Sequence, residues 1–113
     1  MSGDGVTVAE IVEHAYRCGA VQVTNAHDPD GEVVEYWTMV DGAPAITATE
    51  HGRGACPTDS MEIAFPTGTQ VSVRLRWGRV ASISAKSAPG HLNGVWRDTR
   101  AWREAIANAG ALT

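Results

Sequence analysis

The sequence predicts an α+β fold: a single antiparallel sheet of five to six strands flanked by an N-terminal and a C-terminal helix. Both ends of the chain show the 3.6-residue apolar periodicity of amphipathic helices, whereas the segments between them alternate with a period of two. Short turn signals separate the alternating segments, and strands joined by hairpins form antiparallel sheets. The length of 113 residues predicts one domain that spans residues 1–113.

The first helix is expected to begin at Thr7, after a flexible, glycine-containing lead at residues 1–6. Thr7 and Glu10 have the spacing of a capping box, in which the two side chains satisfy free backbone N–H groups at a helix start. Gly19 is expected to end the helix, because glycine readily adopts the left-handed backbone conformation found there. The apolar face comprises Val8, Ile11, Val12, Ala15 and Tyr16.

The middle of the chain is expected to form strands, because β-branched and aromatic residues alternate with polar ones there. Asp28–Gly31 and Asp41–Gly42 are strong turn signals, the second typical of a hairpin. The segment between them carries bulky residues on both faces, which predicts either a central strand or a strand with one face that meets a partner. His51–Asp59 is expected to be a loop, longer than most hairpin connections. The expected strands begin at Val21 and then span 32–40, 45–49, 61–65, 71–77 and 80–85.

The last two expected strands form a hairpin. Val71, Val73, Leu75 and Trp77 alternate with polar residues and are expected to face the core, with Gly78-Arg79 as the turn. In the returning strand, one face is expected to carry Ala81, Ile83 and Ala85.

The second helix is expected over Arg97–Ala109, with Asp98 or Thr99 as its cap and Gly110 as its end. Arg100 and Glu104 have the spacing of an i, i+4 ion pair. Two such helices would cover one face of the sheet, so the other face is either solvated or meets a partner. The narrow apolar stripe comprises Trp102, Ala105, Ile106 and Ala109.

The composition excludes several classes of protein. With 43% hydrophobic and 19% charged residues, the chain is neither disordered, nor collagenous, nor a disulfide-dense toxin. No apolar run approaches the roughly 20 residues that span a bilayer, and the first residues lack the basic and apolar pattern of a secretory signal. We therefore expect a cytoplasmic protein with free thiols. The preference for arginine, glycine and alanine is typical of a GC-rich bacterium or its phage.

The charge is divided between the two halves of the chain. Residues 1–65 carry 11 acidic side chains against two arginines, a net charge of −9, whereas residues 66–113 carry a net charge of +5. Such a division favours charge-guided recognition of a protein partner and leaves head-to-tail self-association open.

The leading prediction is a small non-enzymatic interaction protein of the inhibitor, immunity or accessory type. Acidic residues of the first strands and turns would form a docking face for a basic partner. Trp37 would anchor the interface, since aromatic and arginine side chains contribute most to such contacts. The expected partner-binding residues are Asp28, Asp30, Glu32, Glu35, Trp37 and Arg53.

A nucleic-acid-binding domain is the first alternative. Arginines near tryptophans are compatible with phosphate and base contacts. A pI of about 5.4 argues against it, because nucleic-acid-binding domains are usually basic. The residues expected to serve this function are Arg74, Arg76, Arg79, Arg100 and Arg103.

A small enzyme or metal protein is the second alternative. A nucleophile and base could come from Cys56 with His51 or His91, and two His/Cys pairs could form a tetrahedral zinc site. No tight ligand spacing and no cysteine-hydrolase signature supports either reading. We therefore expect no cofactor. The weak zinc candidates are His14, Cys18, His51 and Cys56.

Overall fold

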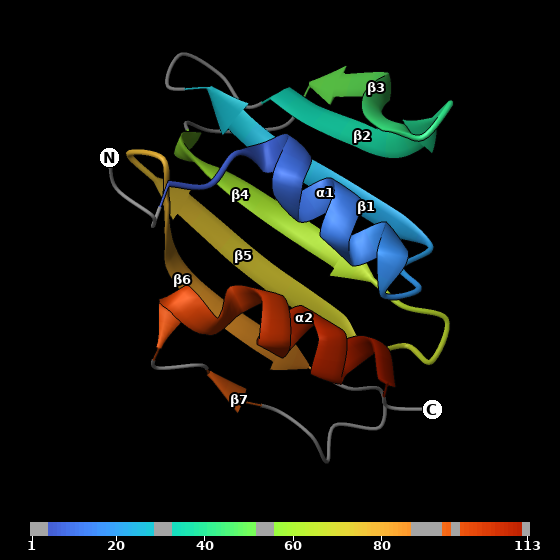
Figure 1. Cartoon of the computed structure of the whole chain (residues 1–113). Coiled ribbons are helices and arrows are strands. Elements are labelled where there is room, and N and C mark those ends of the chain that lie inside the picture. Colours follow the sequence, from blue (N-terminus) through green and yellow to red (C-terminus); the bar gives the residue numbers. More distant parts are fainter. Residues whose placement is uncertain (1–4, 29–32, 52–55, 87–93, 96–97, 112–113) are drawn as a thin grey trace.

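The computed structural model describes residues 5–28, 33–51, 56–86, 94–95 and 98–111 (Figure 1). It confirms the predicted α+β class. One antiparallel sheet has the strand order β3-β2-β1-β4-β5-β6-β7, with a helix at each end of the chain. The elements are α1 (Val8–Arg17), β1 (Gln22–Asp28), β2 (Val33–Val40), β3 (Ala43–His51), β4 (Cys56–Ala64), β5 (Gln70–Arg76), β6 (Arg79–Lys86), the two-residue β7 (Gly94–Val95), the 3-10 turn η1 (Thr99–Ala101) and α2 (Trp102–Ala111).

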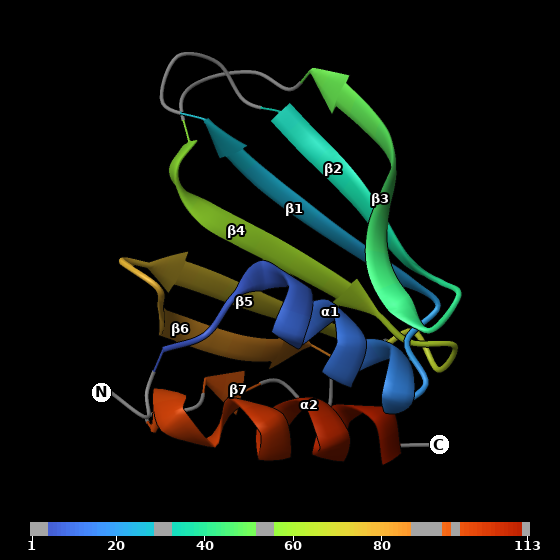
Figure 2. The same cartoon turned by 45° about the horizontal axis from the view of Figure 1, so that its top comes forward.

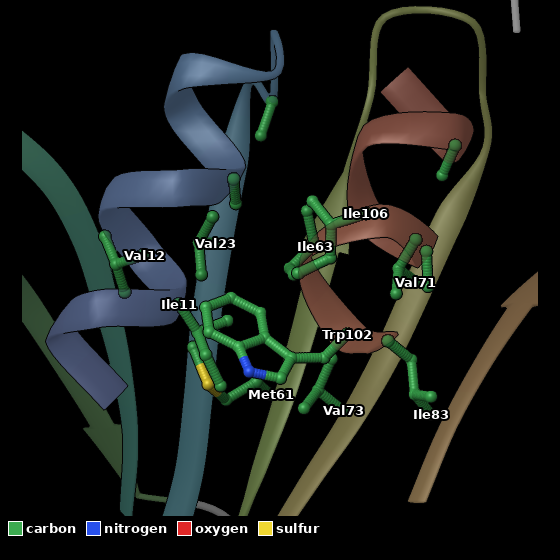
Figure 3. Close-up of a cluster of buried hydrophobic side chains, with 14 of the residues drawn as sticks. Ile11, Val12, Val23, Met61, Ile63, Val71, Val73, Ile83, Trp102 and Ile106 are labelled. Atoms are coloured by element: carbon green, nitrogen blue, oxygen red, sulfur yellow. The ribbon is translucent and has the colours of Figure 1, made fainter. Parts of the chain in front are cut away.

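Both helices cover the same face of the sheet, as predicted (Figures 1 and 2). The core lies between this face and the helices, where Ile11 of α1 and Ile106 of α2 are fully buried. Figure 3 shows Trp102 of α2 among the side chains of this core. The strand residues of the core include Val23, Met61, Ile63, Val71, Val73 and Ile83.

Helix α1 has the predicted ends. The Thr7 hydroxyl accepts a hydrogen bond from the Glu10 backbone N–H over 3.1 Å, and Gly19 follows the helix with a φ of 102°. Val6, within the lead expected to be flexible, packs against the core and donates its N–H to the Gly78 carbonyl over 2.7 Å. The start of α1 is thereby tied to the turn between β5 and β6.

The predicted cap at Asp98 is confirmed. Asp98 has an extended backbone, with φ −92° and ψ 97°, and accepts the Arg100 N–H over 3.1 Å. A residue in this conformation caps a helix from outside, so the described helical structure begins after Asp98. Arg97, where the helix was expected to begin, lies outside the described residues. Helical structure begins with η1 and continues as α2.

Gly110 does not end α2 but lies within it. A Cβ atom at this position would lie 2.3 Å from the Cys18 carbonyl oxygen and 3.0 Å from the Phe65 ring. Gly110 therefore permits the close approach of α2 to the end of α1. The prediction of a helix stop was wrong because glycine is needed here for a contact with a residue distant in the chain, which the local sequence does not reveal.

The turn between β5 and β6 differs from the prediction by one residue. Trp77 and Gly78 have φ values of 53° and 73°, and Arg76 pairs with Arg79 across them. Two positive φ values are typical of a type I′ turn, whose twist matches that of the strands. Trp77 therefore lies in the turn, 88% exposed, and does not face the core as expected.

Strand β6 also departs from simple alternation. Val80 pairs with Leu75 and Ser82 with Arg74, so the register shifts at Ala81. Val80 is buried, whereas Ala81 is exposed. The prediction that Ala81 shares a face with Ile83 was wrong, because a bulge shifts the alternation by one residue.

The predicted His51–Asp59 loop is largely strand. Backbone pairing extends β3 to His51, opposite Val33, and begins β4 at Cys56, opposite Asp28. Only residues 52–55, outside the described residues, remain between the two strands. The prediction was wrong because pairing with β1 and β2 sets these ends, and turn-forming residues such as Pro57 do not prevent it.

Candidate functional site

A group of polar side chains lies at the ends of β1, β2 and β4, on the helix-bearing face of the sheet. Figure 2 shows these strand ends extending beyond α1. The register places Asn25 opposite Glu35 on one side and Met61 on the other. We define the carboxylate cluster as Asn25, His27, Glu35, Trp37 and Asp59.

Glu35 is the centre of the carboxylate cluster. Its Oε2 atom lies 2.9 Å from His27 Nε2, and its Oε1 atom accepts from Trp37 Nε1 over 3.2 Å and from Asn25 Nδ2 over 3.4 Å. The Glu35 side chain is only 16% exposed. Three donors compensate the cost of burying most of a carboxylate and hold it in one orientation.

Asn25 joins the two carboxylates of the cluster. It is 1% exposed, and its Nδ2 atom donates to Asp59 Oδ1 over 3.0 Å as well as to Glu35. Because carboxylates only accept hydrogen bonds, this contact sets the orientation of the amide. Its Oδ1 atom has no hydrogen-bond partner among the described residues.

Of the predicted partner-binding residues, the structure brings Glu35 and Trp37 together. The backbone of Asp28 pairs with Cys56 at the same end of the sheet. Asp30, Glu32 and Arg53 lie outside the described residues.

Sequence reasoning missed three members of the cluster: Asn25, His27 and Asp59. The first two alternate with the core residue Val23 along β1, which was the signal that they share its face. Asp59 was missed because it was assigned to a loop, whereas β4 pairs it with Leu75 on the buried face.

The five arginines predicted for nucleic-acid binding lie on two different elements of the fold. Arg74 and Arg76 alternate with the buried Val73 and Leu75, so they lie on the sheet face away from the helices. Arg79, opposite Arg76 in the register, belongs to that face too. In the described part of the chain, none of these three arginines forms an ion pair.

The helix arginines, in contrast, have acidic neighbours. The Arg100 Nε atom lies 3.3 Å from Asp98 Oδ1, so Arg100 pairs with this residue instead of the expected Glu104. Arg103 lies 3.9 Å from Glu10 of α1 and stacks on the Trp102 ring. These arginines therefore stabilise the contacts of η1 and α2 and carry less uncompensated charge.

His14 and Cys18 lie 3.6 Å apart on α1, but their geometry disfavours a metal or a reactive thiolate. His14 Nε2 lies 2.8 Å from the Arg103 carbonyl oxygen, which only accepts, so this nitrogen carries a proton. It is therefore neither a metal ligand nor a base toward the sulfur. Burial raises the pKa of the Cys18 thiol.

The metal candidates with described side chains lie on separate elements of the fold. His51 ends β3, opposite Val33, whereas His14 and Cys18 lie on α1. His91 lies outside the described residues, and of Cys56 only the backbone is described. Among the residues with described positions, no group of three or more His, Cys, Asp or Glu side chains could hold a metal ion.

Comparison with protein-family models, with curated proteins and with solved structures found no match to this chain. In the described part of the chain, no helix combines the length and the apolar character needed to cross a bilayer.

Proposed function

We propose that the protein binds a protein partner through the carboxylate cluster, as an inhibitor, immunity or accessory protein does. The observation that carries the proposal is the Glu35 carboxylate, held by three donors beside the half-buried Trp37. The proposed location is the cytoplasm, where Cys18 stays a thiol.

The geometry of Glu35 favours recognition of a cationic side chain. A carboxylate already fixed by neighbouring groups loses little conformational freedom on binding, which lowers the entropic cost of association. Asp59, joined to Glu35 through Asn25, adds a second negative charge close by. A lysine or arginine of a basic partner would find two acceptors and an aromatic ring at one place.

The acidic residues expected around the cluster extend the proposed interface. Asp28 lies next to His27 in the chain, at the end of β1. Asp30, Glu32 and Arg53 belong to the proposal on the strength of the sequence alone. Further negative charge would accelerate encounter with a basic partner.

The test is capture of a partner with the tagged protein from an extract of the source organism, followed by titration with the purified partner. Glu35→Gln and Asp59→Asn are each expected to weaken binding at least about tenfold, because each removes a charge near the centre of the interface. The matched control is Arg74→Gln, which changes a charge on the opposite face. Undiminished binding by both variants would refute the proposal.

A further inference from the structure

We propose that the sheet face opposite the helices binds single-stranded nucleic acid along β4, β5 and β6, with Trp77 stacking on a base at the end of β5. This inference is independent of the proposed protein partner, because it uses the other face of the sheet. We define the arginine–serine face as Ser60, Ser72, Arg74, Arg76, Arg79 and Ser82.

The sheet register aligns these side chains in rows across three strands. Arg74 lies between Ser60 of β4 and Ser82 of β6, and Arg76 lies opposite Arg79. Between these rows lies a hollow of ≈ 300 Å³, lined by Ser60, Ser72, Arg74 and Ser82 among others. Short hydroxyl side chains allow an extended ligand backbone to approach the sheet and offer it hydrogen bonds.

The charge of this face is positive although the whole chain carries −4. Lys86 adds a further basic side chain at the far end of β6. The acidic exception is Glu62, whose carboxylate already accepts the Ser72 hydroxyl over 2.7 Å. Arg74, Arg76 and Arg79 have no ion-pair partner among the described residues, so their guanidinium groups are available to phosphates.

Trp77 supplies the second, independent observation. Its side chain is 88% exposed, and its backbone has a φ of 53°, a conformation that bulky residues rarely adopt. Neither the exposure nor the backbone strain stabilises the fold, and such outliers occur preferentially at functional sites. The β5–β6 turn that carries Trp77 projects at the edge of the molecule (Figure 2).

Trp77 is also arranged for stacking. The Arg76 guanidinium lies 4.6 Å from the centre of the indole ring and covers one side of it. The exposed side remains for a base, and stacking on aromatic rings is how proteins bind single strands without reading their sequence. An acidic peptide would pair with the arginines but would leave the indole without a matching planar group. The combination therefore favours nucleic acid over an acidic protein segment.

The test is fluorescence anisotropy of a labelled oligothymidylate of about 15 nucleotides, titrated with the full chain at about 50 mM and about 200 mM salt. Three phosphate contacts predict an affinity that falls by about 20-fold between these two salt concentrations. Trp77→Ala is expected to weaken binding at least about fivefold, and a duplex of equal length is expected to bind less tightly, because its bases are stacked on each other.

The control variants distinguish oligonucleotide binding at the arginine–serine face from binding elsewhere on the protein. The triple variant Arg74→Gln/Arg76→Gln/Arg79→Gln is expected to remove the salt dependence, whereas Arg17→Gln/Arg100→Gln keeps binding, since both of these arginines are ion-paired. Circular dichroism verifies that each variant is folded. Glu35→Gln and Asp59→Asn, which test the protein partner, are expected to leave oligonucleotide binding intact.

Three results would overturn the inference. One is the absence of oligonucleotide binding at the lower salt concentration, and another is binding that the triple variant retains. The third is binding of a poly-glutamate peptide at least as tight as that of the oligonucleotide and insensitive to Trp77→Ala, which would assign the face to an acidic protein.

Discussion

The Nδ2 atom of Asn25 donates a hydrogen bond to the Oδ1 atom of Asp59 over 3.0 Å, although the two residues are 34 positions apart in the chain. The same nitrogen reaches Glu35 from the other side. One buried amide thus connects three neighbouring strands and keeps two carboxylates close together. The candidate site therefore depends on Asn25, which contributes no charge of its own.

Replacing this amide by a carboxylate is expected to destabilise the protein. Asn25→Asp puts a third acidic group where the donor to Glu35 and Asp59 was, at a position that is 1% exposed. The expected loss is about 2–4 kcal/mol at pH 7, because charge repulsion adds to the loss of two hydrogen bonds.

Urea denaturation at two pH values measures this effect. The introduced aspartate is buried beside two other carboxylates, which favours its neutral form, so it takes up a proton as the pH is lowered toward about 4 and the difference from the wild type is expected to shrink. Glu62→Gln, on the opposite face, is the control and is expected to change stability little. A pH-independent difference would show that lost packing, and not charge, is responsible.

Adding one methyl group at the helix contact is expected to destabilise the fold. The Cβ atom in Gly110→Ala would lie 2.3 Å from the Cys18 carbonyl oxygen, so α2 must shift away from the end of α1. Because the clash is with a backbone atom, we expect an overpacking cost in the upper part of the usual range of about 1–3 kcal/mol, which exceeds the roughly 1 kcal/mol that alanine gains over glycine in a helix. Thermal unfolding measures it, with the exposed Asn108→Ala on the same helix as the control. Equal or higher stability of Gly110→Ala would contradict the close contact.

Trp77→Asn is expected to separate stability from binding. Asparagine tolerates the φ of 53° better than tryptophan does, and Asn-Gly is the favoured sequence of a type I′ turn. We expect a gain of about 0.5–1 kcal/mol in the free energy of unfolding, together with weaker oligonucleotide binding. Chemical denaturation and the anisotropy titration measure the two effects on one sample. A loss of stability would show that Trp77 serves the fold.

The stability that Asp98 contributes as the cap of η1 is expected to depend on pH in a defined direction. The Arg100 N–H and guanidinium hold the pKa of Asp98 below its ordinary value. A lowered folded-state pKa stabilises the protein at pH values above the unfolded pKa, and the stabilisation disappears as the pH falls through the lower folded value.

Asp98→Ala is therefore expected to lower the midpoint of thermal unfolding by a few degrees at neutral pH. The difference is expected to narrow below about pH 4, where Asp98 in the unfolded chain is protonated. Thermal unfolding followed by circular dichroism across this range tests both statements. A difference that grows on acidification would contradict the assigned role of Asp98.

The sequence by itself determined the class of the fold and most of its local features. The Thr7 cap, the Gly19 stop and the Asp41-Gly42 turn depend on residues close together in the chain, so their chemistry is readable without coordinates. The common face of Glu35 and Trp37 was equally readable, because strand side chains alternate with a fixed period.

Tertiary structure decided the site and the corrections. Pairing with β1 and β2 turned most of the expected His51–Asp59 loop into strand and brought Asp59 to Asn25. Contact with Cys18 placed Gly110 inside a helix, and the β5–β6 register moved Trp77 into an exposed turn. Each of these outcomes depends on a partner distant in the chain or on a one-residue shift in register. Local propensity does not specify either, because the free energy that selects them comes from pairing and packing in the complete sheet.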